Sequence, residues 1–258
     1  MFSNHRWAKG FFAACLLAIL VCAASAPGYG QVSGPKGTML QISTVTGLER
    51  GLFYPVTTVG WMKQNGNIGL GAFEGMDGEL LILDGKAYNA MYSGQVVAVE
   101  DNSPIVYGAV AQMSTDRTES LQNIASYEQL QKNLEQWLPN KNIFYVFKVQ
   151  VTFNYLKVRS TPKQQIPYTG LADVVKNQSI FEFNNIKGTL IGFRCPAYIQ
   201  GVYAPGFHLH FISEDRQKGG HVLEANVADL TAQIGYLTQM YLVLPDNEAT
   251  RKMDMSAK

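Results

Sequence analysis

Cysteine, histidine and charge of either sign are all scarce in this sequence. Of its three cysteines, Cys15 and Cys22 lie in an apolar run near the N-terminus, which leaves Cys195 without an intramolecular partner in the rest of the chain. A fold held by disulfides is therefore excluded, and Cys195 is expected in the core. Only 16% of the residues are charged and the formal net charge is +1. This balance excludes the strongly basic surface of a nucleic-acid-binding protein.

Long apolar runs are also absent, apart from one at the N-terminus. Two basic residues precede an apolar stretch at 11–24, and small residues at 24–26 supply a cleavage site. The stretch is shorter than the roughly 20 residues that cross a bilayer, so it is typical of a secretory signal peptide. We therefore predict a signal peptide at 1–26, a flexible tether at 27–37, and a secreted or periplasmic protein without a membrane segment once the leader is removed.

Turn-forming dipeptides divide much of the remaining chain into short apolar segments. Asn65-Gly66, Asp77-Gly78 and Asp84-Gly85 each favour a tight turn, and strand-like runs such as 80–83 lie between them. Turns at this spacing are typical of antiparallel strands. We predict a meander of short strands between residues 66 and 113.

Helical spacing is clearest in the segment that follows Ser126. This serine can cap a helix over 127–138, in which Leu130 and Leu134 recur at helical spacing before Pro139 stops it. Shorter helices are predicted over 58–64 and 171–176. Strands are predicted over 143–158, 181–183, 188–193, 198–203, 207–212, 221–227 and 239–244.

The histidines gather in one short window. His5 lies in the leader, and the other three are His208, His210 and His221. In a strand, residues i and i+2 point to the same face, so His208 and His210 would project together. The polar stretch 213–220 is typical of a hairpin loop that would return His221 beside them. Three neutral imidazoles suit zinc, with copper, nickel and iron as chemical alternatives, and they leave a position open for substrate or water. The alternative is an ordinary surface His-x-His pair.

Five motifs in order along the chain carry a resemblance to a known family. They lie at residues 41–44, 69–80, 158–168, 188–194 and 208–223. Each motif is short, but five of them at compatible spacings are specific. Through them the chain resembles alpha-acetolactate decarboxylase from about Leu40 to the C-terminus.

The resemblance implies a mixed, strand-rich α/β fold of two domains. We expect residues 38–168 to form an N-terminal domain built on a mixed sheet. Residues 169–258 would form a β-barrel-like C-terminal domain that carries the metal site. The resemblance also implies a homodimer joined through sheet edges, and a small-molecule substrate, acetolactate.

The same resemblance implies zinc-dependent conversion of 2-acetolactate to acetoin and carbon dioxide. By position in the motifs, His208, His210 and His221 would hold zinc, which as a Lewis acid would stabilise the enediolate left when carbon dioxide departs. Arg159 would hold the substrate carboxylate through two parallel hydrogen bonds. Glu79 would be a further ligand or a proton relay. Without the motifs, Glu79 would be a solvent-facing residue after a turn, and Arg159 a surface charge.

The sequence departs from the family pattern at two places. Ala72 stands where relatives usually carry threonine, and the chain ends ten residues after Glu248, where relatives usually continue into a tail that supplies another glutamate. Either Glu248 or Asp254 substitutes for that group, or the group is absent, or the sequence is shortened. Two other functions therefore stay open, a non-catalytic or impaired secreted homologue and a cupin-type metal-dependent oxygenase.

Overall fold

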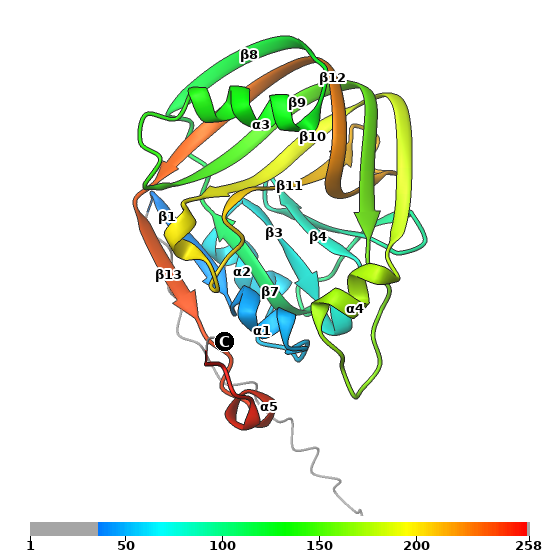
Figure 1. Cartoon of the computed structure of the whole chain (residues 1–258), viewed down its shortest axis with the longest axis vertical. Coiled ribbons are helices and arrows are strands. Elements are labelled where there is room, and N and C mark those ends of the chain that lie inside the picture. Colours follow the sequence, from blue (N-terminus) through cyan, green and yellow to red (C-terminus); the bar gives the residue numbers. More distant parts are fainter. Residues whose placement is uncertain (1–35, 257–258) are drawn as a thin grey trace, which may run out of the picture. The chain divides into compact units, whose positions relative to one another are not determined.

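A computed structural model of the chain describes residues 36–256, in which strands predominate (Figure 1). The predicted leader at 1–26 and most of the predicted tether, residues 27–35, lie outside the described residues. Within the described range, no helix combines the length and the apolarity needed to cross a membrane. The prediction of a strand-rich α/β class is confirmed.

The first sheet is mixed and has eight strands. Its order is β13-β1-β7-β3-β4-β5-β6, with β2 beside β7. β13 runs parallel to β1, and the other pairs are antiparallel. β3 to β6 form a meander of short strands, as predicted within residues 66–113, and β7 returns to pair with β3. The strands are β1 (Thr38–Ile42), β2 (Thr57–Thr58), β3 (Ile68–Phe73), β4 (Glu79–Leu83), β5 (Lys86–Ala90), β6 (Val96–Ala98), β7 (Pro104–Ala111) and β13 (Gln239–Val243).

The second sheet is antiparallel and contains the longest strands. Its order is β11-β10-β9-β12-β8, and β11 also pairs with β12. The strands are β8 (Arg117–Ile124), β9 (Phe144–Ser160), β10 (Ser179–Cys195), β11 (Gly206–Ser213) and β12 (Gly219–Leu237). The boundary predicted between residues 168 and 169 falls between β9 and β10, which pair in one sheet. It therefore does not separate the two sheets, and the barrel-like C-terminal half stays a prediction.

Two of the predicted helices, α2 and α3, begin at a hydroxyl side chain that caps them. Ser126 accepts a hydrogen bond from the Gln129 amide at the start of α3, and Thr58 caps α2 in the same way. Both hydroxyls satisfy an amide that would otherwise lack a partner at the helix end. α4 has the predicted bounds. The helices are α1 (Val45–Glu49), α2 (Val59–Asn65), α3 (Tyr127–Gln136), α4 (Leu171–Lys176) and α5 (Glu248–Lys252), with single 3-10 turns η1 (Glu74–Met76) and η2 (Ala197–Ile199).

Two strand predictions are wrong in detail. The strand expected over 198–203 is absent, because residues 197–199 form η2 and Gly201 turns the backbone at a φ of +90°. The two strands expected over 181–183 and 188–193 are one continuous strand, β10. The intervening Asn184-Asn185 pair interrupts the apolar pattern, and Asn185 has a φ of +53° and no partner in the ladder, but the same register resumes at Ile186.

Apolar residues lie on both faces of the second sheet. On one face, Val146 and Phe193 share a buried cluster with Leu70 and Leu81 of the first sheet. On the other face, Phe147 and Val149 pack with the apolar residues of α3. The sheet is therefore a central layer, and its side chains facing the first sheet can meet those of β3 and β4.

Candidate metal centre

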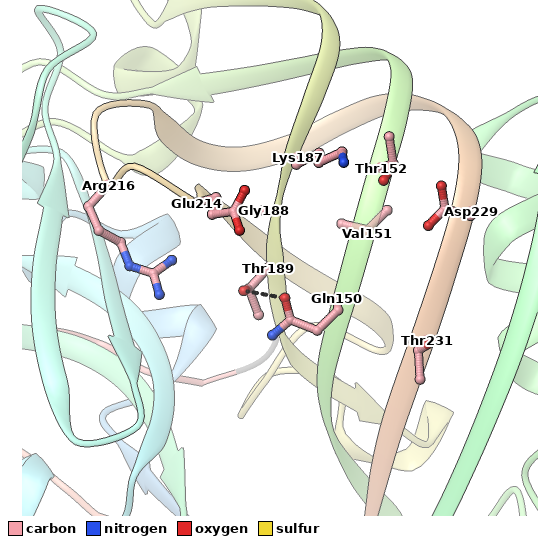
Figure 2. Close-up of a pocket in the computed structure, with 10 residues that line it drawn as sticks. All are labelled: Gln150, Val151, Thr152, Lys187, Gly188, Thr189, Glu214, Arg216, Asp229 and Thr231. Atoms are coloured by element: carbon pink, nitrogen blue, oxygen red, sulfur yellow. Dashed lines mark hydrogen bonds between the residues drawn. The ribbon is translucent and has the colours of Figure 1, made fainter.

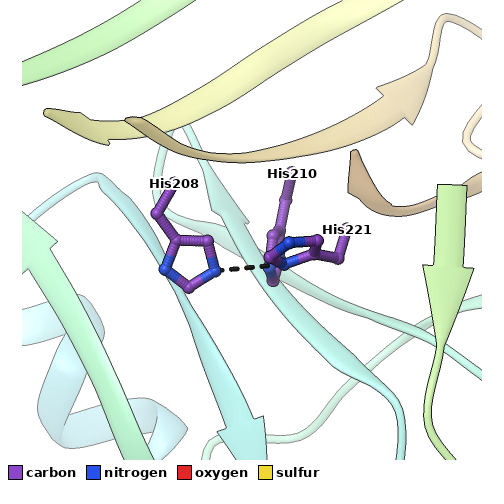
Figure 3. A group of neighbouring side chains, drawn as sticks. All are labelled: His208, His210 and His221. Carbon is purple, nitrogen blue, oxygen red and sulfur yellow. Dashed lines mark hydrogen bonds between the residues drawn. The ribbon is translucent and has the colours of Figure 1, made fainter. Parts of the chain in front are cut away.

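Three imidazole rings converge on β11 and β12 of the second sheet (Figure 3). His208 and His210 project from β11, and His221 on β12 pairs with His210 in the antiparallel register. Their ligand atoms all lie within 4.8 Å of one another. Leu209, between the two β11 histidines, is buried on the opposite face. The structure thus brings together the three histidines that strand periodicity and the hairpin loop predicted to be neighbours.

The rings are oriented by specific contacts. The Nδ1 atom of His210 lies 2.9 Å from the Leu80 carbonyl oxygen, so Nδ1 carries the proton and donates it. The Nε2 atom of His210 then bears a lone pair, and it is buried without a hydrogen-bond partner among the described residues. The Nε2 atom of His208 lies 3.2 Å from Nδ1 of His221. This separation matches the roughly 3.3 Å expected between two nitrogens on one tetrahedral zinc ion with bonds of about 2.0–2.1 Å.

The electrostatic environment keeps these rings neutral. Burial lowers the pKa of His208 to about 3, and the guanidinium of Arg159 acts in the same direction. Burial is also the main cause that holds the pKa of His210 and the pKa of His221 well below their usual range. The neutral imidazole is the form that binds a metal ion.

A buried ion pair lies next to the histidines. Glu79 is the first residue of β4, and only 5% of it is exposed. Its Oε1 atom accepts a hydrogen bond of 3.1 Å from Nη1 of Arg159, and its Oε2 atom lies 3.5 Å from Nε2 of His210. Burial raises the pKa of Glu79 to about 7, against the lowering effect of Arg159. The alternatives of a solvent-facing Glu79 and a surface Arg159 are therefore wrong.

The residues present fit a zinc ion. Three neutral imidazoles and one adjacent carboxylate form a donor set that zinc prefers. The unpartnered Nε2 of His210 is the lone pair that such an ion requires. The hydrogen bond from His210 to Leu80 supplies the outer contact that fixes the ring of a metal ligand.

Sequence reasoning missed two contacts at this centre. The Leu80 carbonyl orients His210, but a backbone carbonyl leaves no signature in the residue type. Tyr203 is fully buried and its ring centroid lies 5.5 Å from that of His208. Tyr203 is visible in the sequence as an aromatic residue close to the histidines. The strand wrongly predicted over 198–203 did not indicate that its ring would lie against His208.

The tail carboxylates are engaged elsewhere. Glu248 is exposed and pairs with Lys252 within α5. Asp254 accepts hydrogen bonds from Ser256, and Arg50 donates to the Asp254 and Ser256 carbonyls. Neither carboxylate joins the histidine cluster in the part of the chain that the structure describes. Ala72, the other departure, is buried between the two sheets.

A separate polar cavity of about 310 Å³ lies over the second sheet (Figure 2). Its lining includes the charged residues Lys187, Glu214, Arg216 and Asp229. The Thr189 hydroxyl, also in the lining, donates a hydrogen bond to Gln150. None of its lining residues belongs to the histidine cluster.

Known proteins resemble this chain over most of its length. A family model described as alpha-acetolactate decarboxylase matches residues 39–257. The alpha-acetolactate decarboxylase of Methanosarcina mazei is 40% identical over 207 residues, which cover 80% of this chain and 72% of that protein. The enzyme of the same name from Brevibacillus brevis is 35% identical over 232 residues, covering 90% and 81%. This chain therefore belongs to the alpha-acetolactate decarboxylase family.

The fold agrees with membership of this family. The crystal structure of alpha-acetolactate decarboxylase from Bacillus subtilis strain 168 superposes with a TM-score of 0.83 at 30% identity, covering 85% of this chain and 94% of that one. The family assignment made from the five motifs is thus confirmed. The matched region contains the histidine cluster, Glu79 and Arg159.

The turn before Glu79 in this member of the alpha-acetolactate decarboxylase family requires glycine at position 78, and this requirement can be tested. Gly78 has a φ of +83°, and a Cβ added to it would lie 2.1 Å from Oδ1 of Asn89. Gly85 has a similar φ of +74° but nothing within 4 Å. We expect Gly78→Ala to lower the free energy of unfolding by about 2–4 kcal/mol, because strain and overlap add. Gly85→Ala should cost about 1–2 kcal/mol.

Urea unfolding of both variants measures this difference. Gly85→Ala is the matched control, since it changes the same residue type at a similar backbone angle. Equal losses in the two variants would show that the space beside Asn89 does not restrict the turn.

Proposed function

We propose that this chain catalyses the zinc-dependent decarboxylation of 2-acetolactate to acetoin and carbon dioxide. The observation that carries the proposal is the convergence of His208, His210 and His221 beside the buried Glu79–Arg159 pair. It is supported by membership of the alpha-acetolactate decarboxylase family over residues 39–257.

Arg159 is suited to hold the substrate carboxylate. Its side chain is 15% exposed, and Glu79 is the side chain that hydrogen-bonds to it among the described residues. A guanidinium has five N–H donors in a planar fork, so donors remain for a second carboxylate. Two parallel hydrogen bonds would fix the plane of that carboxylate. They would thereby orient the carbon–carbon bond that breaks.

The histidines are suited to hold the metal ion, whose chemistry the reaction needs. When carbon dioxide leaves, the electron pair of the broken bond passes toward the neighbouring ketone and leaves an enediolate. A bound zinc ion supplies Lewis acidity that stabilises this negative charge. His210 would keep its ligand nitrogen in place through its hydrogen bond to Leu80.

Glu79 is our candidate for proton transfer or for an additional ligand. Its carboxylate lies between Arg159 and His210, with one oxygen directed at each. Protonation of the carbon that lost carbon dioxide completes acetoin. A proton delivered from one fixed carboxylate reaches one face of that carbon, which would give a single enantiomer.

Metal removal tests the zinc requirement. We expect a chelator-treated sample to release no acetoin from racemic acetolactate, and added Zn²⁺ to restore release, because the Lewis acid is needed for the charge that develops. Acetoin would be measured directly, with dioxygen uptake followed in parallel. Full activity without metal would rule out the zinc proposal. Iron-dependent dioxygen consumption would indicate the oxygenase, and zinc binding without any turnover a non-catalytic homologue.

Substitution of the arginine tests the carboxylate clamp. We expect Arg159→Ala to lower kcat by about 10²–10³-fold, since a donor placed at the reacting group is lost. The zinc content should remain at the wild-type level, because the histidines hold the ion. Lys157→Ala is the control, as Lys157 lies on the same strand but pairs with Glu224 at the surface. Wild-type rates in Arg159→Ala would remove the clamp from the mechanism.

We also propose that the protein is a secreted or periplasmic homodimer. β6 and β13 are the outermost strands of the first sheet, so each has one edge that pairs with no other strand of that sheet. They carry the exposed apolar residues Val97 and Tyr241. Such edges favour pairing with another chain. Light scattering on the purified protein should give twice the chain mass, and a monomer mass at micromolar concentration would contradict the proposal.

A further inference from the structure

Hydrogen bonds from the second sheet and the loop after it surround Glu79 on the first sheet. His210 donates to the Leu80 carbonyl, the residue that follows Glu79, at 2.9 Å. The Ser160 hydroxyl donates to the Ala90 carbonyl at 2.7 Å, and the Thr161 hydroxyl to the Met76 carbonyl at 2.8 Å. Ser160 and Thr161 are not metal ligands and play no part in the steps described above. Both nevertheless join the end of β9, which carries Arg159, to the backbone around Glu79.

The Ser160 bond runs beside the ion pair. Ser160 follows Arg159 at the end of β9, and Ala90 is the residue paired with Glu79 in the β4–β5 ladder. Two adjacent residues of β9 therefore contact two directly paired residues of the first sheet. The hydrogen bond from Ser160 to Ala90 therefore limits how far the Arg159 guanidinium can shift relative to the Glu79 carboxylate.

Thr161 holds the turn that leads into Glu79. Its hydroxyl donates to Met76, and its carbonyl oxygen accepts from the Gly78 amide at 3.1 Å. Gly75, Met76 and Gly78 all have positive φ angles, of +67°, +60° and +83°. A left-handed backbone is unfavourable for methionine, so this turn needs contacts that hold it. Thr161 supplies one on each side of Asp77.

Both hydroxyls act away from solvent. Ser160 and Thr161 are 0% exposed, so water cannot easily replace a lost donor. An apolar side chain of the same shape would leave the packing intact while it releases the turn. The turn would lose some stability, and the alignment of Glu79 would change with it.

We propose that Thr161, with Ser160, is a positioning residue that sets Glu79 against Arg159 for the reaction. The inference rests on the proposed decarboxylase function. In this role Thr161 touches neither substrate nor metal. It fixes the carboxylate at the place where a proton has to be delivered.

The test compares Thr161→Val, which removes the hydroxyl at nearly constant shape, with Thr161→Ser, which keeps it. We expect Thr161→Val to lower kcat by about 10–100-fold, as a small misplacement of a reacting group does, with KM within about threefold. KM should hold because Arg159 still binds the carboxylate. Thr161→Ser should restore most of kcat, and both variants should retain wild-type zinc content.

Thr189→Val is the matched control. Thr189 is also buried and its hydroxyl donates to Gln150 in the same sheet, away from the histidines. It should lose stability but keep kcat. Equal kcat in Thr161→Val and the wild type would overturn the inference, and so would an equal kcat loss in Thr189→Val. If Thr161→Val does not fold, Ser160→Ala takes its place, with the same kcat loss expected and an unchanged kcat overturning the proposal.

Hydrogen exchange separates this inference from the proposed function. The Gly78 amide donates to the carbonyl oxygens of Met76 at 2.9 Å and of Thr161 at 3.1 Å, and the Thr161 hydroxyl donates to that same Met76 carbonyl. Loss of the hydroxyl releases the Met76 carbonyl, so exchange of the Gly78 amide, followed in the peptide containing residues 74–79, should accelerate in Thr161→Val and not in Thr189→Val. A wild-type protein that makes no acetoin would overturn the decarboxylase function. Unchanged exchange in Thr161→Val would overturn the positioning role, whatever the activity.

Discussion

The ion pair between Glu79 and Arg159 joins a carboxylate of the first sheet to a guanidinium of the second. Both side chains are largely buried, so each would bear a large desolvation penalty without the other. Burial raises the pKa of Glu79 and Arg159 opposes that rise, while the same guanidinium helps to lower the pKa of each of the three histidines. One cation thus favours the ionised carboxylate and the neutral imidazoles together.

The register of the second sheet brings these groups to one place. His221 on β12 pairs with His210 on β11 and with Arg159 on β9, so three strands present their side chains side by side. A slip of one residue would turn His221 to the opposite face. The first sheet contributes Glu79 and the Leu80 carbonyl from consecutive positions of β4. The centre is therefore specified by the pairing within one sheet and the packing between two.

Strand periodicity and turn signals in the sequence predicted the histidine cluster, which lies on two strands that are neighbours in the sequence. The i, i+2 spacing of His208 and His210, and the hairpin loop before His221, sufficed to bring three imidazoles together. The burial of Glu79 could not be predicted from the Asp77-Gly78 turn, because it depends on a sheet whose strands come from a distant part of the chain. The contact of Leu80 with His210 was equally hidden, since any residue type offers the same carbonyl. Family motifs pointed to Glu79 and Arg159, but without a physical reason for their alignment.

The lone pair of His210 connects the stability of the fold to its chemistry. A buried nitrogen without a hydrogen-bond partner costs free energy, and here Nε2 has none among the described residues. The ring cannot turn to satisfy that atom without losing the bond from Nδ1 to Leu80, which ties β11 to β4. The fold thus holds the unpaired Nε2 atom of His210 in a fixed orientation, although its burial is unfavourable. A cation bound there would remove this penalty in the folded chain, whereas in the unfolded chain the nitrogen is hydrated and the three histidines are not held together. Ion binding would therefore stabilise the same sheet contact that aligns Glu79 with Arg159.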